Sequence, residues 1–152
     1  MTLPSSWGSV AEWYNHHLEG DDSSYHRKVL LPNLLRAMAI VPGDTVLDIG
    51  CGQGMFAEAC ARSGANVVGV DVAEEMIAIA DKRTTINDLP KDSLRFFISA
   101  AQAVPMITDA SMDKVVIVLS LQNMDRVHEV LLECYRVLRP TGNIYLVFNH
   151  PA

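Results

Sequence analysis

The sequence predicts an α/β fold in which a mainly parallel sheet is covered by helices on both faces. Short apolar runs alternate along the chain with segments of helical periodicity. The runs are apolar at successive positions, as in strands that are buried on both faces. A glycine-rich loop follows the first run, and 152 residues are enough for one domain with its own core.

The elements follow from these patterns in chain order. We expect helices at 10–18 and 24–40, and Pro32 predicts a kink or a fresh turn in the second of them. After a stop signal at 41–44, we expect strands at 45–50, 66–71, 94–99, 113–120 and 143–149, and helices at 53–63, 73–83 and 124–138. The segment RPTGN (139–143) predicts a turn before the last strand. With right-handed crossovers, this order gives a Rossmann-like, doubly wound sheet.

Composition excludes several classes of function. The net charge of −6 and the scattered lysines and arginines argue against nucleic acid as a partner. No apolar run approaches the roughly 18 residues that span a bilayer, and the N-terminus does not resemble a signal peptide. The three cysteines lack the spacing of a metal site or a disulfide framework, and Cys60 and Cys134 fall on apolar helix faces. We therefore expect a cytoplasmic protein with no metal and no membrane partner.

The glycine-rich loop DIGCGQG (48–54) predicts a nucleotide-type ligand, but two ligands fit it. Gly52, Gly54 and Ala57 match the G-x-G-x-x-G/A pattern of dinucleotide-binding loops. The second ligand is S-adenosylmethionine, whose methionyl end carries an ammonium group. A carboxylate beside the loop, Asp48, suits that cation. Asp71 ends the second predicted strand, where a carboxylate can accept hydrogen bonds from ribose hydroxyls or cap the next helix. The loop alone leaves both ligands open.

Further segments distinguish the two ligands, since they occur in order between residues 41 and 148. The chain resembles the class I S-adenosylmethionine-dependent methyltransferases of the ubiquinone and menaquinone biosynthesis type in DIGCGQG, VVGVD (67–71), SAAQAVP (99–105), DASMDKVVIVLSLQNM (109–124) and RVLRPTGNIYLV (136–147). The N-terminal segment also resembles a narrower methyltransferase group that has a Trp-Tyr pair, a Ser-Tyr pair and an Asn-His-Pro tail.

The resemblance implies sheet order 3-2-1-4-5, an N-terminal helical lid (1–40) and a cofactor-binding core (41–152). It implies that S-adenosylmethionine is held by Asp48, Gly50, Cys51, Gly52, Gly54, Asp71, Val72, Met76, Ala101, Gln102 and Leu119, with Tyr14 and Tyr25 from the lid. The chain departs from the family at Ala100, where an acidic residue often contacts the adenine amino group. Plain helix packing is the alternative role of the two tyrosines, and we expect His26 to be exposed.

The expected reaction is an in-line methyl transfer to a small-molecule acceptor, with S-adenosylhomocysteine as the product. Gln122 and Asn123 follow the fourth strand and are candidates for the acceptor pocket or for a helix start. His150 is a candidate base or an ordinary surface histidine. The Asn-Pro-Pro-aromatic motif of amino-directed nucleic-acid methyltransferases is absent at residues 121–124. The alternatives are a non-catalytic S-adenosylmethionine-binding module and an NAD-binding oxidoreductase fragment.

The resemblance raises one expectation about assembly. The family's sheet has two more strands beside the fifth, so a domain truncated after strand 143–149 is expected to leave an apolar edge. An uncharged, exposed edge strand is a site for pairing with another chain. We therefore expect either self-association through that edge or lower stability than in a longer form.

Overall fold

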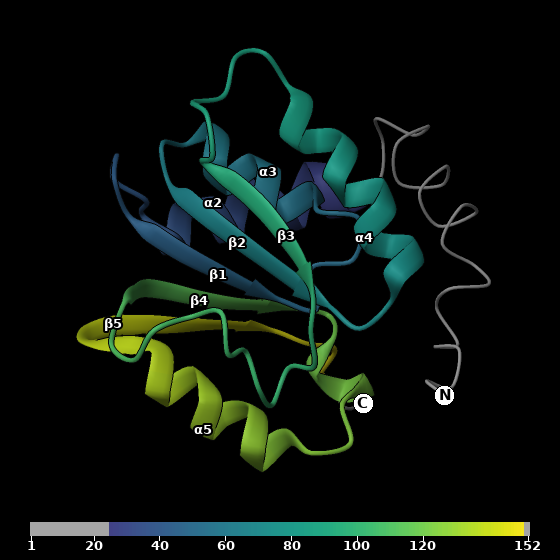
Figure 1. Ribbon diagram of the computed structural model, residues 1–152, viewed down its shortest axis with the longest axis vertical. Helices are drawn as coiled ribbons and strands as arrows, with labels where there is room; N and C mark the ends of the chain where they lie inside the picture. The colour runs from purple at the N-terminus through teal and green to yellow at the C-terminus, as the bar shows by residue number, and fades with distance from the viewer. Residues whose placement is uncertain (1–24, 151–152) are drawn as a thin grey trace.

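The computed structural model describes residues 25–150 and contains a parallel sheet of five strands in the order β3-β2-β1-β4-β5 (Figure 1). The order confirms the prediction of a doubly wound Rossmann-like sheet. The predicted helix at 10–18 and Tyr14 lie outside the described residues. The strands are β1 (Thr45–Ile49), β2 (Asn66–Asp71), β3 (Leu94–Ile98), β4 (Met112–Val118) and β5 (Leu138–Val147).

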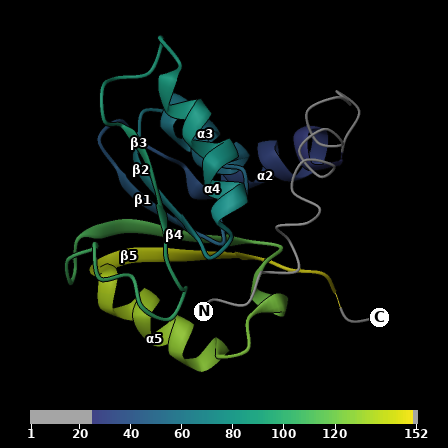
Figure 2. The same ribbon diagram turned by 45° about the vertical axis from the view of Figure 1, so that its right-hand side comes forward.

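Helices cover both faces of the sheet, as Figures 1 and 2 show. The helices α2 (Leu31–Met38), α3 (Met55–Arg62) and α4 (Glu74–Asp81) lie on one face, and α5 (Val127–Val137) lies on the other. Each face has its own buried cluster: Leu34, Cys60 and Phe96 belong to the first, and Leu47 and Cys134 to the second. Burial on both faces explains why the strands are almost continuously apolar.

The second face is also covered by a loop between β3 and β4. Within this loop, Val104 is completely buried and Ile107 is 5% exposed, and both pack in the same cluster as Val130 of α5. The loop thus runs from the carboxyl end of β3 across the sheet toward α5.

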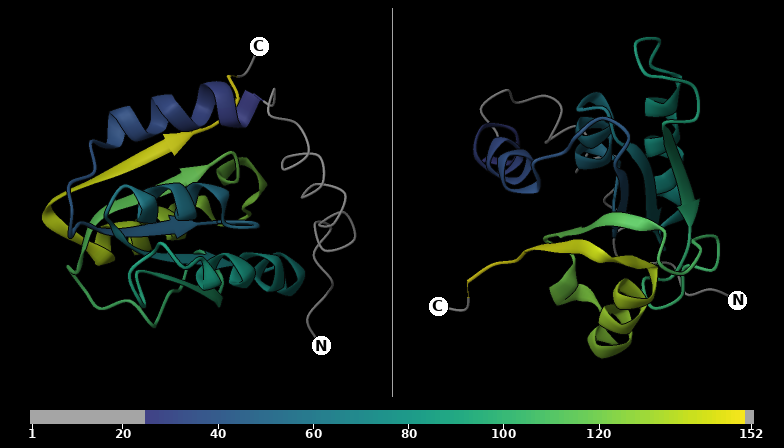
Figure 3. Two further views of the ribbon diagram at one scale, coloured as in Figure 1. Left: turned by 90° about the horizontal axis from the view of Figure 1, so that it is seen from above. Right: turned by 90° about the vertical axis from the view of Figure 1, so that its left-hand side faces the viewer.

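The Pro32 prediction is confirmed in one of its two forms. A π-helical segment, His26–Leu30, is followed by α2, and Pro32 lies in the first turn of α2. Proline is tolerated there because the first helical N–H groups have no partner within the helix. Figure 3 shows the two segments as one nearly continuous helical rod.

The segment RPTGN (139–143) interrupts the pairing of β5 with β4. Helix α5 ends at Val137, and β5 begins with the next residue, which pairs with Met112 of β4. The next pair is Lys114 with Asn143, so residues 139–142 bulge out opposite a single residue of β4. A Cβ atom at Gly142 would lie 3.0 Å from the carbonyl oxygen of Arg139, so the bulge is tight. The predicted turn is therefore a bulge inside β5, and continuous pairing begins at Asn143, where the last strand was predicted to start.

Residues 25–150 lack two kinds of feature, a membrane-spanning helix and a metal-binding cluster. No helix in this part of the chain is long and apolar enough to cross a bilayer. The same residues contain no group of three or more His, Cys, Asp or Glu side chains that could hold a metal ion.

Candidate functional site

A cavity of about 330 Å³ opens at the carboxyl ends of the strands. The loops after β1, β2, β3 and β4 contribute Gly52, Val72, Ala101 and Leu119, and the segment before α2 contributes His26. In doubly wound sheets this edge is the usual place for a ligand, because the loops from adjacent strands diverge there. The fold therefore brings together residues that are far apart in the sequence.

The three glycines of the loop after β1 serve different purposes. A Cβ atom at Gly50 would lie 2.5 Å from Oγ of Ser120, and one at Gly54 would lie 2.5 Å from the ring of Phe96. Those two glycines allow close packing within the protein. A Cβ atom at Gly52 would meet no protein atom within 4 Å, although its φ of +54° still favours glycine. Gly52 borders the cavity, so the space beside it can be filled by a ligand.

Asp71 at the end of β2 ties the glycine loop to the neighbouring strand. One of its carboxylate oxygens accepts a hydrogen bond of 2.9 Å from the backbone N–H of Gly52, and the other accepts one of 2.9 Å from Ala73. Each carboxylate oxygen has a second lone pair, so Asp71 can accept further hydrogen bonds from a ligand in the cavity. The bond to Ala73 precedes the helix, because Ala73 is the N-cap of α4 (Glu74–Asp81) and no side chain caps that helix, so the capping role predicted for Asp71 is wrong.

Asp48 at the end of β1 lies in the cavity wall with only 2% of its surface exposed. Burial, and then the neighbouring charge of Asp71, raise the pKa of Asp48 to about 8. Among the described residues, no cationic side chain forms a salt bridge with either carboxylate. A cationic ligand group would supply the missing counter-charge and favour the ionised carboxylate.

A second network holds the glycine loop from outside the cavity. Nε of Arg83 donates a hydrogen bond of 2.7 Å to the backbone carbonyl of Gln53, and the same guanidinium pairs with Glu58 at 2.5 Å. The side chain of Gln53 is 3% exposed, and neither amide atom has a hydrogen-bond partner in the described structure. A buried amide without partners costs stability, so Gln53 weakens the fold beside the glycine loop.

The comparisons with known proteins identify the family. A family model described as a methyltransferase domain matches residues 47–146, which include the glycine loop and the other loops of the cavity except the segment at His26. The chain belongs to the methyltransferase domain family.

The relatives of this methyltransferase domain include enzymes named for quinone biosynthesis. It is 34% identical over 112 residues to a demethylmenaquinone methyltransferase of Lactobacillus johnsonii, covering 72% of this chain and 45% of that protein. It is 28% identical over 110 residues to a ubiquinone biosynthesis O-methyltransferase of Xanthomonas campestris, with the same coverage of 72% and 45%. The chain therefore spans a little under half the length of these curated relatives.

A solved structure supports the fold of the methyltransferase domain. The crystal structure of the YcgJ protein of Bacillus subtilis is similar with a TM-score of 0.73 and 26% sequence identity. The similarity covers 79% of this chain and 50% of that one. It agrees with the sheet order described above.

Most of the residues predicted from the sequence line the cavity of the methyltransferase domain. They are Asp48, Gly50, Cys51, Gly52, Asp71, Val72, Met76, Ala101, Gln102, Leu119 and Asn123. Burial, with the nearby charge of Asp48, raises the pKa of the Cys51 thiol well above its usual value, so this cysteine is not a nucleophile at neutral pH.

Four predicted residues lie elsewhere in the structure. Gly54 faces Phe96, and the side chain of Gln122 donates a hydrogen bond of 2.9 Å to the carbonyl of Leu119. Tyr25 is 61% exposed and its ring meets that of His26 edge-on. His150 is exposed beyond the end of β5. Asn123 is thus the one of the three catalytic candidates that lines the cavity.

The sequence reasoning also missed residues of the cavity. The largest omission is His26, which was expected to be exposed but lines the cavity. No local pattern marks it, because its place depends on how the N-terminal helix packs. Some of the other residues lie inside the quoted motifs, namely Gln53, Val70, Ser99, Val118, Ser120 and Met124. The rest directly follow those motifs: Met55, Phe56, Asp125 and Arg126.

The pKa of Asp48 predicts a pH dependence in the ligand-free domain. Between pH 5 and 7, the folded state keeps a proton on Asp48 that the unfolded chain, with a pKa near 3.8, has lost. The free energy of unfolding should therefore fall as pH rises through this range, by about 1 kcal/mol per pH unit from this group. Asp48→Asn should remove that part of the slope, measured by urea unfolding at several pH values. An unchanged slope would contradict the assignment.

Alanine substitutions at Gly52 and Gly54 should differ in their effects on ligand affinity and on stability. Gly52→Ala places a methyl group in the cavity and should weaken S-adenosylhomocysteine binding at least about tenfold, while the left-handed backbone costs about 1 kcal/mol of stability. In Gly54→Ala the added methyl group would collide with the ring of Phe96. This collision should cost about 1–3 kcal/mol of stability in addition to the cost of the left-handed backbone. Calorimetric titration and urea unfolding measure the two quantities. Equal losses of affinity in the two variants would contradict separate roles.

Proposed function

We propose that this domain binds S-adenosylmethionine and transfers its methyl group to a small-molecule acceptor. The observation that carries the proposal is the pair of carboxylates, Asp48 and Asp71, at the ends of adjacent strands beside the open space at Gly52. Family membership supports the same conclusion. The names of the relatives support a quinol or phenol as the first acceptor to test.

The residues of the cavity fit the parts of this cofactor. Asp48 would hold the ammonium group, because a buried carboxylate gains most from a cation. Asp71 would accept hydrogen bonds from the ribose hydroxyls. Val72, Met76 and Ala101 provide apolar surface for the base, and Gln102 provides a polar group beside it. Tyr14 and Tyr25 stay predictions as lid residues.

The cofactor supplies an electrophilic methyl group, so the protein's part is orientation and the exclusion of water. Met55, Phe56, Val118 and Met124 form an apolar wall that suits both tasks. Asn123 borders the same cavity and is our candidate for orienting the acceptor. Gln122 and His150 have weaker support, since neither lines the cavity. A cytoplasmic location is part of the proposal and is supported by three free cysteines.

Two alternatives remain distinct in their tests. A non-catalytic binding module is favoured by Ala100, which cannot contact a base through a polar side chain. An NAD-binding oxidoreductase is favoured only by the match of Gly52, Gly54 and Ala57 to the dinucleotide pattern. Gly54 faces Phe96, which weakens that match.

The proposal is tested by calorimetric titration with S-adenosylhomocysteine and with NADH. We expect saturable binding of S-adenosylhomocysteine, at least about tenfold weaker in Asp48→Asn because the ammonium group loses its counter-charge. Affinity of the unaltered domain should rise by up to about tenfold per pH unit between pH 6 and 8, as Asp48 ionises, and should stay flat in the variant. Binding of NADH alone would refute the proposal. Transfer of labelled methyl groups to demethylmenaquinone or to phenolic acceptors then separates an enzyme from a binding module.

We also propose that the domain associates with itself through the free edge of β5. Within the described residues β5 pairs only with β4. Ile144 and Leu146 are alternate, exposed residues on one face of β5, and exposed Phe148 directly follows the strand. We expect concentration-dependent dimers in sedimentation velocity. Leu146→Lys should abolish them, because edge lysines oppose strand pairing, whereas Leu132→Lys on α5 should not. A strictly monomeric chain at high concentration would overturn this proposal.

A further inference from the structure

Residues 99–104 border the cavity without belonging to a helix or strand. Ser99, Ala101 and Gln102 line the cavity beside Val72 and Met76. The side chains at positions 100, 101 and 103 are alanines. Hydrogen bonds from this segment to a ligand must therefore come from its backbone or from Gln102, and they depend on where the backbone lies.

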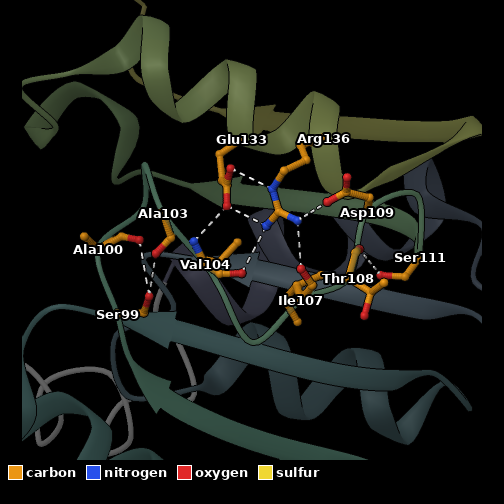
Figure 4. Close-up of polar contacts among 10 residues, drawn as sticks. All are labelled: Ser99, Ala100, Ala103, Val104, Ile107, Thr108, Asp109, Ser111, Glu133 and Arg136. Atoms are coloured by element: carbon orange, nitrogen blue, oxygen red, sulfur yellow. Dashed lines mark hydrogen bonds and ion pairs between the residues drawn. The ribbon is translucent and has the colours of Figure 1, made fainter.

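The segment is anchored at its first residue by the sheet. The backbone N–H of Ser99 donates a hydrogen bond of 2.9 Å to the carbonyl of Asp71. The Ser99 hydroxyl donates one of 2.9 Å to the carbonyl of Ala103 and so closes the loop on itself. Figure 4 shows this contact on the left of the loop.

The other end of the segment is held by two side chains of α5 rather than by regular structure. A carboxylate oxygen of Glu133 accepts a hydrogen bond of 2.8 Å from the N–H of Val104, and Arg136 donates one of 3.1 Å to the carbonyl of the same residue. Val104 is completely buried, so both backbone groups need partners. The Glu133–Arg136 pair supplies them.

Arg136 also fixes the rest of the loop. Its guanidinium donates to the carbonyl of Ile107 at 2.9 Å, to Asp109 at 2.6 Å and to Glu133 at 2.6 Å, as Figure 4 shows. Hydrogen bonds from Arg136 lower the pKa of Glu133, so the pair stays ionised at neutral pH. The guanidinium thereby connects Val104, Ile107 and Asp109 of the loop to α5, and Arg136 does not line the cavity.

From this arrangement we infer that Glu133 and Arg136 are positioning residues for base recognition by backbone 100–102. The inference rests on the proposed function, because it takes the cavity end at Val72, Met76 and Ala101 as the site of the purine base. Neither residue lines the cavity, so each acts through Val104. Loss of either contact would leave the apolar surface for the base in place. It would displace backbone 100–102 and so weaken its hydrogen bonds to the edge of the base.

The test compares S-adenosylhomocysteine with S-inosylhomocysteine, which differs only at the purine edge. Their affinity ratio is insensitive to partial unfolding, since unfolding lowers both affinities equally. We expect the unaltered domain to prefer the adenine form at least about tenfold, as for a site that loses a hydrogen bond with the wrong base. The preference should fall about fivefold or more in Arg136→Met and in Glu133→Met. It should recover in part in Arg136→Lys, which keeps a donor, and in Glu133→Gln, which keeps an acceptor for the N–H of Val104.

Arg62→Met is the matched control, because Arg62 forms ion pairs with Glu58 and Asp88 on the opposite face of the sheet. Its ratio should equal that of the unaltered domain. A ratio unchanged in Arg136→Met and Glu133→Met would overturn the inference, even if both variants were less stable. If one of the two fails to fold, the other decides alone. Failure of the unaltered domain to bind either compound would overturn the proposed function instead.

Discussion

The site depends on the proximity of two carboxylates, Asp48 and Asp71, at the carboxyl edge of the sheet. Parallel pairing of β1 with β2 brings Asp48 near Asp71, and their repulsion adds to burial in raising the pKa of Asp48. Such a pair weakens the ligand-free fold at neutral pH unless a cation enters. Sites that bind charged ligands commonly carry this kind of local instability, since the ligand removes it.

Two arginines hold the loops around this site in place. Arg83 fixes the glycine loop through the carbonyl of Gln53, and Arg136 fixes the loop after β3 through Val104 and Ile107. Both bind backbone carbonyls from outside the cavity and pair with a glutamate. The guanidinium suits this task because its several donors are fixed in one plane. Backbone placement matters here, since Gly52 and Ala101 line the cavity without a polar side chain and can offer a ligand hydrogen bonds only through their backbone.

The sequence predicted the site where function follows from position along a strand. Asp48 and Asp71 stand at strand ends, and parallel strands deliver such residues to one edge. It failed where the outcome depended on packing. His26 lines the cavity because of where its helix lies, and Gln122 turns back to Leu119. At 139–143 the sequence predicted the turn but not the pairing of Leu138 with Met112, which makes that turn a bulge inside β5.

By itself, the sequence determined the fold class, the order of the elements and the glycine loop that marks the family. These depend on local periodicity and on close packing, which few residue types satisfy. Only the tertiary structure decided which glycine faces the cavity, that Gln53 is buried without partners, and that α5 positions the loop after β3. Those features come from contacts between residues far apart in the chain, so the local sequence pattern does not predict them.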